Sequence, residues 1–134
     1  MKRFLVVEDE EMSRIMLTDI LSMYAPTDSA VNGKDGLQLF EKSVNCGDPY
    51  DLVCVDLMMP LMNGLALIRG IRKIEVDNPL FGNQQTKVFV VTSNTCPWEK
   101  AELLLDNLCD DYISKPYDKG RIAGSLHHHY SEIL

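Results

Sequence analysis

Three acidic side chains follow directly on short apolar segments of this sequence. Asp56 ends the segment 53–55 and precedes a Met-Met-Pro turn, so the chain neither continues as a strand nor starts a helix at once. Glu8 and Asp9 follow the apolar segment 4–7 in the same way. Open α/β sheets bind ligands at the carboxyl ends of their strands, and carboxylate oxygens are the ligands that magnesium prefers. The pattern predicts a divalent-metal site, where a cation relieves the repulsion between neighbouring carboxylates.

A lysine and a threonine extend this pattern toward phosphoryl transfer. Lys115 follows another apolar run and precedes Pro116, where a cis peptide would fix how the lysine projects. A carboxylate such as Asp56 can act as a nucleophile and form an acyl phosphate. The reaction needs alignment and neutralised charge, which a metal and a lysine ammonium supply. Thr92 ends the run 88–91 and can donate a hydrogen bond to a phosphoryl oxygen.

Each of these residues also has a purely structural explanation. Glu8 and Asp9 would suit a helix N-terminus, where acids complement the helix dipole and cap free amides. Asp56 would suit a turn after a strand, Lys115 an exposed loop, and Thr92 a helix cap. Their occurrence together at the ends of apolar runs favours a shared site over these separate explanations.

The elements that must position these residues alternate regularly. Apolar strand-like runs are followed by segments with a helical period, at Arg3–Val7, Thr27–Val31, Tyr50–Val55, Lys87–Thr92 and Asp111–Ser114. Strict alternation of this kind predicts an α/β fold with a parallel sheet covered by helices on both faces.

Helical periodicity also groups apolar residues along one side of each predicted helix. In the first helix this side is predicted to carry Met12, Ile15, Met16, Ile20 and Tyr24. In the fourth helix, which starts at Pro97, it is predicted to carry Ala101, Leu104, Leu105 and Leu108. The long connection Glu75–Thr86 contains Pro and Gly and is predicted to be an exposed loop.

Length and composition restrict the class of protein. With 134 residues, the chain is predicted to form one domain over residues 1–134. Its net charge of -7 argues against a nucleic-acid-binding surface. No apolar run approaches the roughly 20 residues that a membrane span needs, and the N-terminal apolar run is too short for a signal peptide. The expected location is therefore the cytoplasm.

Four motifs together resemble the receiver domain of bacterial two-component response regulators. They are VVEDE at 6–10, D-L-M-M-P-x-M-N-G at 56–64, VVTS at 90–93 and DYISKP at 111–116. The resemblance covers residues 1–130. It implies a flavodoxin-like, doubly wound parallel sheet of five strands in the order 2-1-3-4-5 with five helices, an order of which the chemotaxis receiver is a known example.

The resemblance also implies roles for the acidic residues. Asp56 is expected to be the phosphoacceptor. Magnesium, or manganese in its place, is expected to bind Asp9, Asp56 and the main-chain carbonyl of Met58, with Glu8 assisting. A protein phosphorylated in this way would catalyse only its own phosphorylation and slow dephosphorylation. It is not expected to be an enzyme in the wider sense.

Further residues are expected to respond to the phosphoryl group and to set the lifetime of the acyl phosphate. Thr92 and Lys115 would contact the phosphoryl oxygens. Thr92 and Tyr112 would act as switch residues that repack the surface of the fourth helix, fifth strand and fifth helix. Met58 and Asn94 would tune the lifetime of the acyl phosphate, and the apolar Met58 predicts slow self-hydrolysis.

The expected partners are proteins. A sensor histidine kinase or phosphotransfer protein would donate the phosphoryl group, and a downstream protein target would bind the switched surface. The chain is expected to be a stand-alone regulator, either a monomer or a dimer that forms on phosphorylation, without nucleic acid or membrane as partner. Alternatives are a receiver excised from a hybrid kinase or multidomain regulator, and a pseudo-receiver that binds without phosphorylation. A haloacid-dehalogenase-type phosphatase would need a second Asp at position 58, which is Met.

Some features remain outside this interpretation. Leu108 stands where the family usually has a Gly that ends the fourth helix. Trp98 would be either a partner anchor or a residue packed on the loop. Neighbouring helix positions lie about 100° apart, so the run 127–129 of three histidines is not expected to converge on one metal ion.

Overall fold

A five-stranded parallel sheet organises the chain, with the strand order β2-β1-β3-β4-β5. A computed structural model describes residues 2–59, 61–81, 85–93, 97–106 and 108–130. The strands are β1 (Phe4–Val7), β2 (Thr27–Ala30), β3 (Leu52–Val55), β4 (Lys87–Thr92) and β5 (Asp111–Ser114). The helices are α1 (Glu11–Ser22), α2 (Gly33–Asn45), α3 (Gly64–Val76), α4 (Pro97–Leu105) and α5 (Lys119–His129). The predicted fold class and strand order are confirmed.

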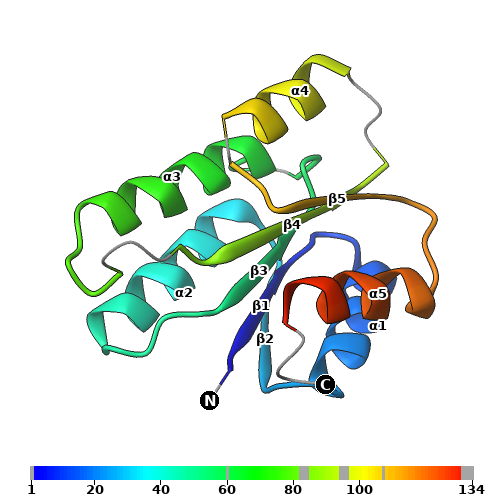
Figure 1. Ribbon diagram of the computed structural model, residues 1–134, viewed down its shortest axis with the longest axis horizontal. Helices are drawn as coiled ribbons and strands as arrows, with labels where there is room; N and C mark the ends of the chain where they lie inside the picture. Colours follow the sequence, from blue (N-terminus) through cyan, green and yellow to red (C-terminus); the bar gives the residue numbers. More distant parts are fainter. Residues whose placement is uncertain (1, 60, 82–84, 94–96, 107, 131–134) are drawn as a thin grey trace.

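Helices cover both faces of this sheet. In Figure 1, α1 and α5 lie on one face, and α2, α3 and α4 lie on the other. Every residue of β1 is fully buried, and successive side chains enter opposite cores. Leu5 and Val7 pack with α2 and α3, whereas Phe4 and Val6 pack with α1 and α5. This burial on both faces explains why the strands read as continuous apolar runs.

The strand register brings the functional candidates to one edge of the sheet. Val7 pairs with Val55, and Val55 pairs with Val90. The residues that follow β1 and β3 therefore leave the sheet side by side. Thr92 pairs with Ser114 across β4 and β5, so that the chain after β5 leaves at the same edge. All strands are parallel, so this edge collects every strand end that carries a predicted site residue.

The apolar sides predicted for α1 and α4 coincide only in part with the buried sides: Ile20 and Leu108 are buried as expected. α1 buries Leu17, Ile20 and Leu21, while Met12, Ile15 and Met16 are exposed. α4 buries Leu103 and exposes Leu104 and Leu105. Apolar residues cover more than one side of both helices, and periodicity alone does not determine which side meets the sheet. Contacts with the strands decide it.

The connection between α3 and β4 is exposed over most of its described residues and is buried at its two ends. α3 continues to Val76, and both Glu75 and Thr86 are buried. The ring of Phe81 stacks on that of Phe40, with centroids 6.2 Å apart. The exposed-loop prediction holds for the described middle of the connection, while its ends are buried because Glu75 accepts hydrogen bonds from Arg72 and from the Thr86 N–H.

Arg72 is the centre of that anchoring. Its guanidinium donates to Glu75 Oε1 at 2.9 Å and to the carbonyl of Thr86 at 2.7 Å. It also donates to the carbonyl of Leu108 at 3.2 Å and lies 3.6 Å from Asp110 Oδ2. A buried Arg paired in this way satisfies several carbonyls at once. The segment after α4 is thereby joined to α3 and to the start of β4.

None of the helices in the described ranges is both long enough and apolar enough to span a membrane.

Candidate functional site

The loop after β3 holds Asp56 at the end of its strand. The backbone N–H of Asp56 bonds the Val7 carbonyl at 3.1 Å, and its Oδ1 accepts from the Met58 N–H at 2.9 Å. The chain then turns sharply into α3, whose N-cap is Asn63. A Cβ on Gly64 would lie 2.5 Å from the Asp56 carbonyl oxygen, so only glycine permits this close approach.

Lys115 joins two carboxylates from neighbouring strands. Its Nζ lies 3.1 Å from Glu8 Oε2 and 3.1 Å from Asp56 Oδ2. Glu8 and Asp56 are both buried, whereas Asp9 is exposed. One ligand oxygen from each of these three acids lies within 4.8 Å of the others. The strand ends thus bring together the acids and the lysine that were predicted to meet.

The N-cap of α1 is neither Glu8 nor Asp9, the two acids considered for it from the sequence. Glu10 is the N-cap of α1, and its side chain accepts from the N–H groups of Met12 and Ser13. Glu8 and Asp9 therefore do not serve as that cap. This leaves their carboxylates for the cluster around Lys115.

The charges of this cluster are strongly coupled. Burial and the nearby Asp56 raise the pKa of Glu8 to about 7, although Lys115 opposes the shift. Burial by itself lowers the pKa of Lys115, but the hydrogen bonds and charges of Asp56 and Glu8 outweigh it, so that the pKa is raised. The site accordingly holds more negative charge than one lysine neutralises, and it favours binding of a further cation.

The donor set fits magnesium. The candidate side-chain ligands are all carboxylate oxygens, and the three acids are the only such group within the described part of the chain. Magnesium usually binds one or two carboxylates and fills its other positions with water or phosphate oxygens. An exposed Asp9 beside two buried acids leaves one side of the cluster open for those ligands.

Thr92 and Tyr112 lie on the two strands beside this cluster. Thr92 is fully buried at the end of β4, and its carbonyl accepts from the Lys115 N–H at 2.9 Å. The Lys115–Pro116 peptide is cis, the isomer considered for this position on sequence grounds. Tyr112 packs partly buried against the core on the α2–α3–α4 face, and the Lys100 ammonium lies 5.2 Å from its ring centroid. Both predicted switch residues thus lie on β4 and β5, the strands that precede the lysine.

The two predicted lifetime residues differ in what the structure describes. The side chain of Met58 is 62% exposed, and its backbone N–H bonds the Asp56 carboxylate. Asn94 lies outside the described residues, so its predicted role has no structural counterpart here.

Arg14 is a site residue that was not predicted from the sequence. Its guanidinium donates to the Glu8 carbonyl at 3.2 Å and to the Asp9 carbonyl at 3.4 Å. These bonds fix the backbone that carries the two acids. A basic residue in the first turn of the helix that follows an acid pair is the signal that would have suggested this contact.

Leu61 is a second residue without a sequence signal. It lies in the loop between Asp56 and Asn63, has a backbone φ of 68°, and is 81% exposed. Leucine is neither a usual turn residue nor one that adopts positive φ, so residue type alone does not indicate this conformation.

Trp98 and the three histidines are the remaining candidates. Trp98 is exposed on α4 rather than packed on the loop. His129 packs on Phe89 with ring centroids 5.2 Å apart, while His127 and His128 are exposed.

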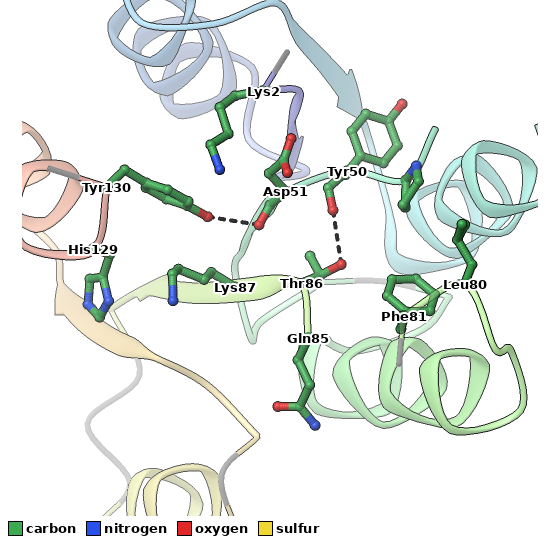
Figure 2. A pocket seen from close by; sticks show the side chains of 11 residues that line it. Lys2, Tyr50, Asp51, Leu80, Phe81, Gln85, Thr86, Lys87, His129 and Tyr130 are labelled. Atoms are coloured by element: carbon green, nitrogen blue, oxygen red, sulfur yellow. Dashed lines mark hydrogen bonds between the residues drawn. The ribbon is translucent and has the colours of Figure 1, made fainter. Parts of the chain in front are cut away.

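A cavity of about 430 Å³ lies at the opposite edge of the sheet, where β3 and β4 begin. Figure 2 shows its lining, including the hydrogen bonds from Tyr130 to the Asp51 carbonyl and from Thr86 to the Tyr50 carbonyl. Because Asp51 precedes β3 whereas Asp56 follows it, this cavity is separate from the acidic cluster.

Comparison with known proteins agrees with this geometry. Residues 4–127 match the family described as the response regulator receiver domain. Response regulator ArlR of Staphylococcus saprophyticus is 34% identical over 119 residues, which cover 88% of this chain and 47% of that protein. ArlR of Staphylococcus aureus is 33% identical over the same share of this chain and 48% of its own length. The chain therefore spans about half of the length of these relatives.

Solved structures share the fold over nearly the whole chain. A CheY-like response regulator receiver domain protein from Methanospirillum hungatei has a TM-score of 0.81 at 21% identity, covering 99% of this chain and 96% of that one. Response regulator protein TrrA from Thermotoga maritima, solved in complex with Mg²⁺–BeF, has a TM-score of 0.73 at 27% identity and covers all of both chains.

Proposed function

Because the chain belongs to the response regulator receiver domain family, we propose that it is a phosphoacceptor switch in which Asp56 takes up a phosphoryl group. The observation that carries the proposal is Lys115, which bonds both Glu8 and Asp56 at 3.1 Å beside the exposed Asp9. A nucleophilic carboxylate, a second acid and a compact cation thus share one strand-end site. These are the groups that phosphoryl transfer requires.

The proposed reaction is an in-line displacement. A carboxylate oxygen of Asp56 attacks the phosphorus of a phosphohistidine, the new O–P bond forms, and the P–N bond breaks. The bonding electrons leave with the imidazole nitrogen. Lys115 then releases its bond to the Asp56 carboxylate and donates to a phosphoryl oxygen instead, and Thr92 donates to another. Phosphohistidine comes from a sensor histidine kinase or a phosphotransfer protein.

Magnesium belongs to the same proposal. Asp9, Asp56 and the Met58 carbonyl would hold the ion, and Glu8 would assist. When bound, the ion would neutralise charge on the phosphoryl oxygens and on the clustered acids. TrrA, solved with Mg²⁺–BeF, supports this assignment by similarity. The raised pKa of Glu8, caused by burial and then by the nearby charge of Asp56, supports it from the chain itself, because a bound cation would offset both.

We propose that modification is read through the surface of α4, β5 and α5. Thr92 ends β4, and Tyr112 lies on the next strand, so a shift of the threonine toward a phosphoryl group can be coupled to the aromatic side chain. Exposed Trp98 and Leu105 on α4 give this surface apolar contacts for a protein target. A dimer that forms on phosphorylation would use the same surface.

We further propose that residues 1–134 form one receiver unit, and that it acts in the cytoplasm. Its catalysis would be limited to its own phosphorylation and dephosphorylation. The target would be either a separate protein or a further part of a longer chain. The relatives are about twice as long as this chain.

Intact-protein mass spectrometry after incubation with acetyl phosphate and magnesium tests the proposal. We expect the mass of one phosphoryl group to be added to the chain and to be absent from Asp56→Asn. Replacing magnesium by a chelator should abolish the addition. An unmodified chain under all conditions would instead indicate a pseudo-receiver that binds partners without phosphorylation.

A further inference from the structure

Leu61 combines a strained backbone with an exposed side chain. It is the only non-glycine residue with positive φ within the described ranges, at 68°. In this conformation the Cβ of an L-residue crowds the following carbonyl oxygen, a cost that glycine avoids and asparagine largely tolerates.

Burial of the leucine side chain does not offset this strain. Leu61 is 81% exposed, while the neighbouring Met59 and Met62 pack against the core. The fold would therefore be better served by Gly or Asn at this position. A residue that strains the chain without gaining burial indicates a contact outside the folded molecule.

The loop presents Leu61 from a fixed base. At its start, the Met58 N–H bonds Asp56 Oδ1, and at its end the Gly64 N–H bonds the Leu57 carbonyl at 3.1 Å. A Cβ on Gly33 would lie 2.2 Å from the Met62 carbonyl oxygen, which shows how closely the loop packs on the start of α2. Because the backbone on both sides of Leu61 is anchored, binding needs less ordering of the main chain.

Apolar side chains border the acidic site on more than one element. Met58 is 62% exposed in the same loop as Leu61, and Met12 is 70% exposed in the first turn of α1, just after Glu8 and Asp9. A partner that delivers a phosphoryl group to Asp56 must approach this edge. Such a partner would contact these apolar side chains as well as the charged groups of the site.

We propose that Leu61 is a docking residue for the phosphodonor protein, whose phosphohistidine would lie beside an apolar surface. This inference rests on the proposed function of Asp56. Acetyl phosphate is too small to need this contact, so the two classes of donor separate docking from chemistry.

Phosphotransfer kinetics with both donors test the proposal. A panel of purified histidine kinases supplied with ATP is screened, and the kinase that phosphorylates the unmodified chain fastest is used. For Leu61→Ala and Leu61→Asn we expect kcat/KM with this kinase to fall roughly fivefold to thirtyfold, as for loss of an interface anchor. The rate with acetyl phosphate should stay within about twofold, the margin of a surface substitution. Leu61→Asn should also raise the melting temperature, because it relieves the strain.

Val76→Ala is the matched control. Val76 is 82% exposed at the other end of α3, roughly 18 Å from Gly64 at 1.5 Å per residue. Equal kinase rates for the Leu61 variants, Val76→Ala and the unmodified chain would overturn the docking role, and so would equal losses with both donors. If acetyl phosphate and every kinase failed to modify the unmodified chain, the proposed function itself would fall, and the docking inference with it.

Discussion

The Nζ of Lys115 donates a hydrogen bond of 3.1 Å to Asp56 Oδ2, and so connects the residue after β5 to the residue after β3. Because the same ammonium also bonds the buried Glu8, its removal leaves two buried carboxylates without their cation.

We expect Lys115→Ala to lower the free energy of unfolding by about 1–3 kcal/mol in the presence of a chelator. The loss stays below the full cost of an unpaired buried charge, because Glu8 can take up a proton. Magnesium should restore part of it. Chemical denaturation with and without magnesium measures both effects, and Lys119→Ala, at an exposed lysine of α5, is the control. Equal stability of the two variants would contradict the role of Lys115 as the shared cation.

Magnesium binding should depend on pH through Glu8. The pKa of this carboxyl is raised from 4.5 to about 7 in the folded chain, so the folded state binds the proton more tightly than the unfolded state. Without metal, this group therefore contributes stability that is present at low pH and lost as the pH rises through about 7.

A metal ion favours the deprotonated carboxyl and competes with the proton. The rise in melting temperature on adding magnesium should thus be larger at about pH 8 than at about pH 6. In Glu8→Gln, the rise should be smaller and should differ less between the two pH values. A rise that is the same at both pH values in the unmodified chain would show that Glu8 does not compete with the metal.

Met58 should set how long the acyl phosphate lasts. In Met58→Asn, a polar side chain next to Asp56 can orient the attacking water. A hydrogen bond worth about 1.4 kcal/mol in the transition state would speed the loss of phosphate roughly tenfold. The decay of phosphorylated protein after removal of acetyl phosphate measures this rate. Met23→Asn, at another exposed methionine, should leave the decay unchanged, and an unchanged decay in Met58→Asn as well would refute the shielding role.

Gly64 should be indispensable to the loop that holds Asp56. A Cβ there would lie 2.5 Å from the Asp56 carbonyl oxygen, a backbone atom that cannot move without shifting the strand end. We expect Gly64→Ala to lower the free energy of unfolding by about 2–3 kcal/mol. A Cβ on Gly124 in α5 would meet no atom within 4 Å, so Gly124→Ala should instead stabilise the helix by about 0.5–1 kcal/mol. Thermal unfolding of the pair tests the opposite signs.

The convergence of the site was predictable from sequence because it follows from strand order and local pattern. Asp56 and Lys115 each follow an apolar run, and parallel strands end at a common edge. Neither inference needs knowledge of distant contacts. The cap at Glu10 was missed because three neighbouring acids offer the same carboxylate to the helix start, and backbone geometry selects among them.

What sequence could not predict depends on contacts between distant parts of the chain. The buried side of α1 is chosen by its fit to the sheet, so a periodic side that includes Met12, Ile15 and Ile20 does not reveal that only Ile20 of the three is buried. Arg72 carries no periodic or motif signal, yet it bonds carbonyls from two other segments. The positive φ of Leu61 likewise results from how its loop closes between Asp56 and α3.

The hydrogen bond from Arg72 to the Leu108 carbonyl fixes the chain just beyond the C-terminal end of α4. The C-terminal end of the helix is tied to α3 and to the start of β4, whereas its N-terminal end adjoins the segment that follows Thr92. If modification displaces Thr92 as we propose, we expect α4 to rotate about this fixed end. Under this proposal the movement of α4 would be greatest near Trp98, far from the fixed end.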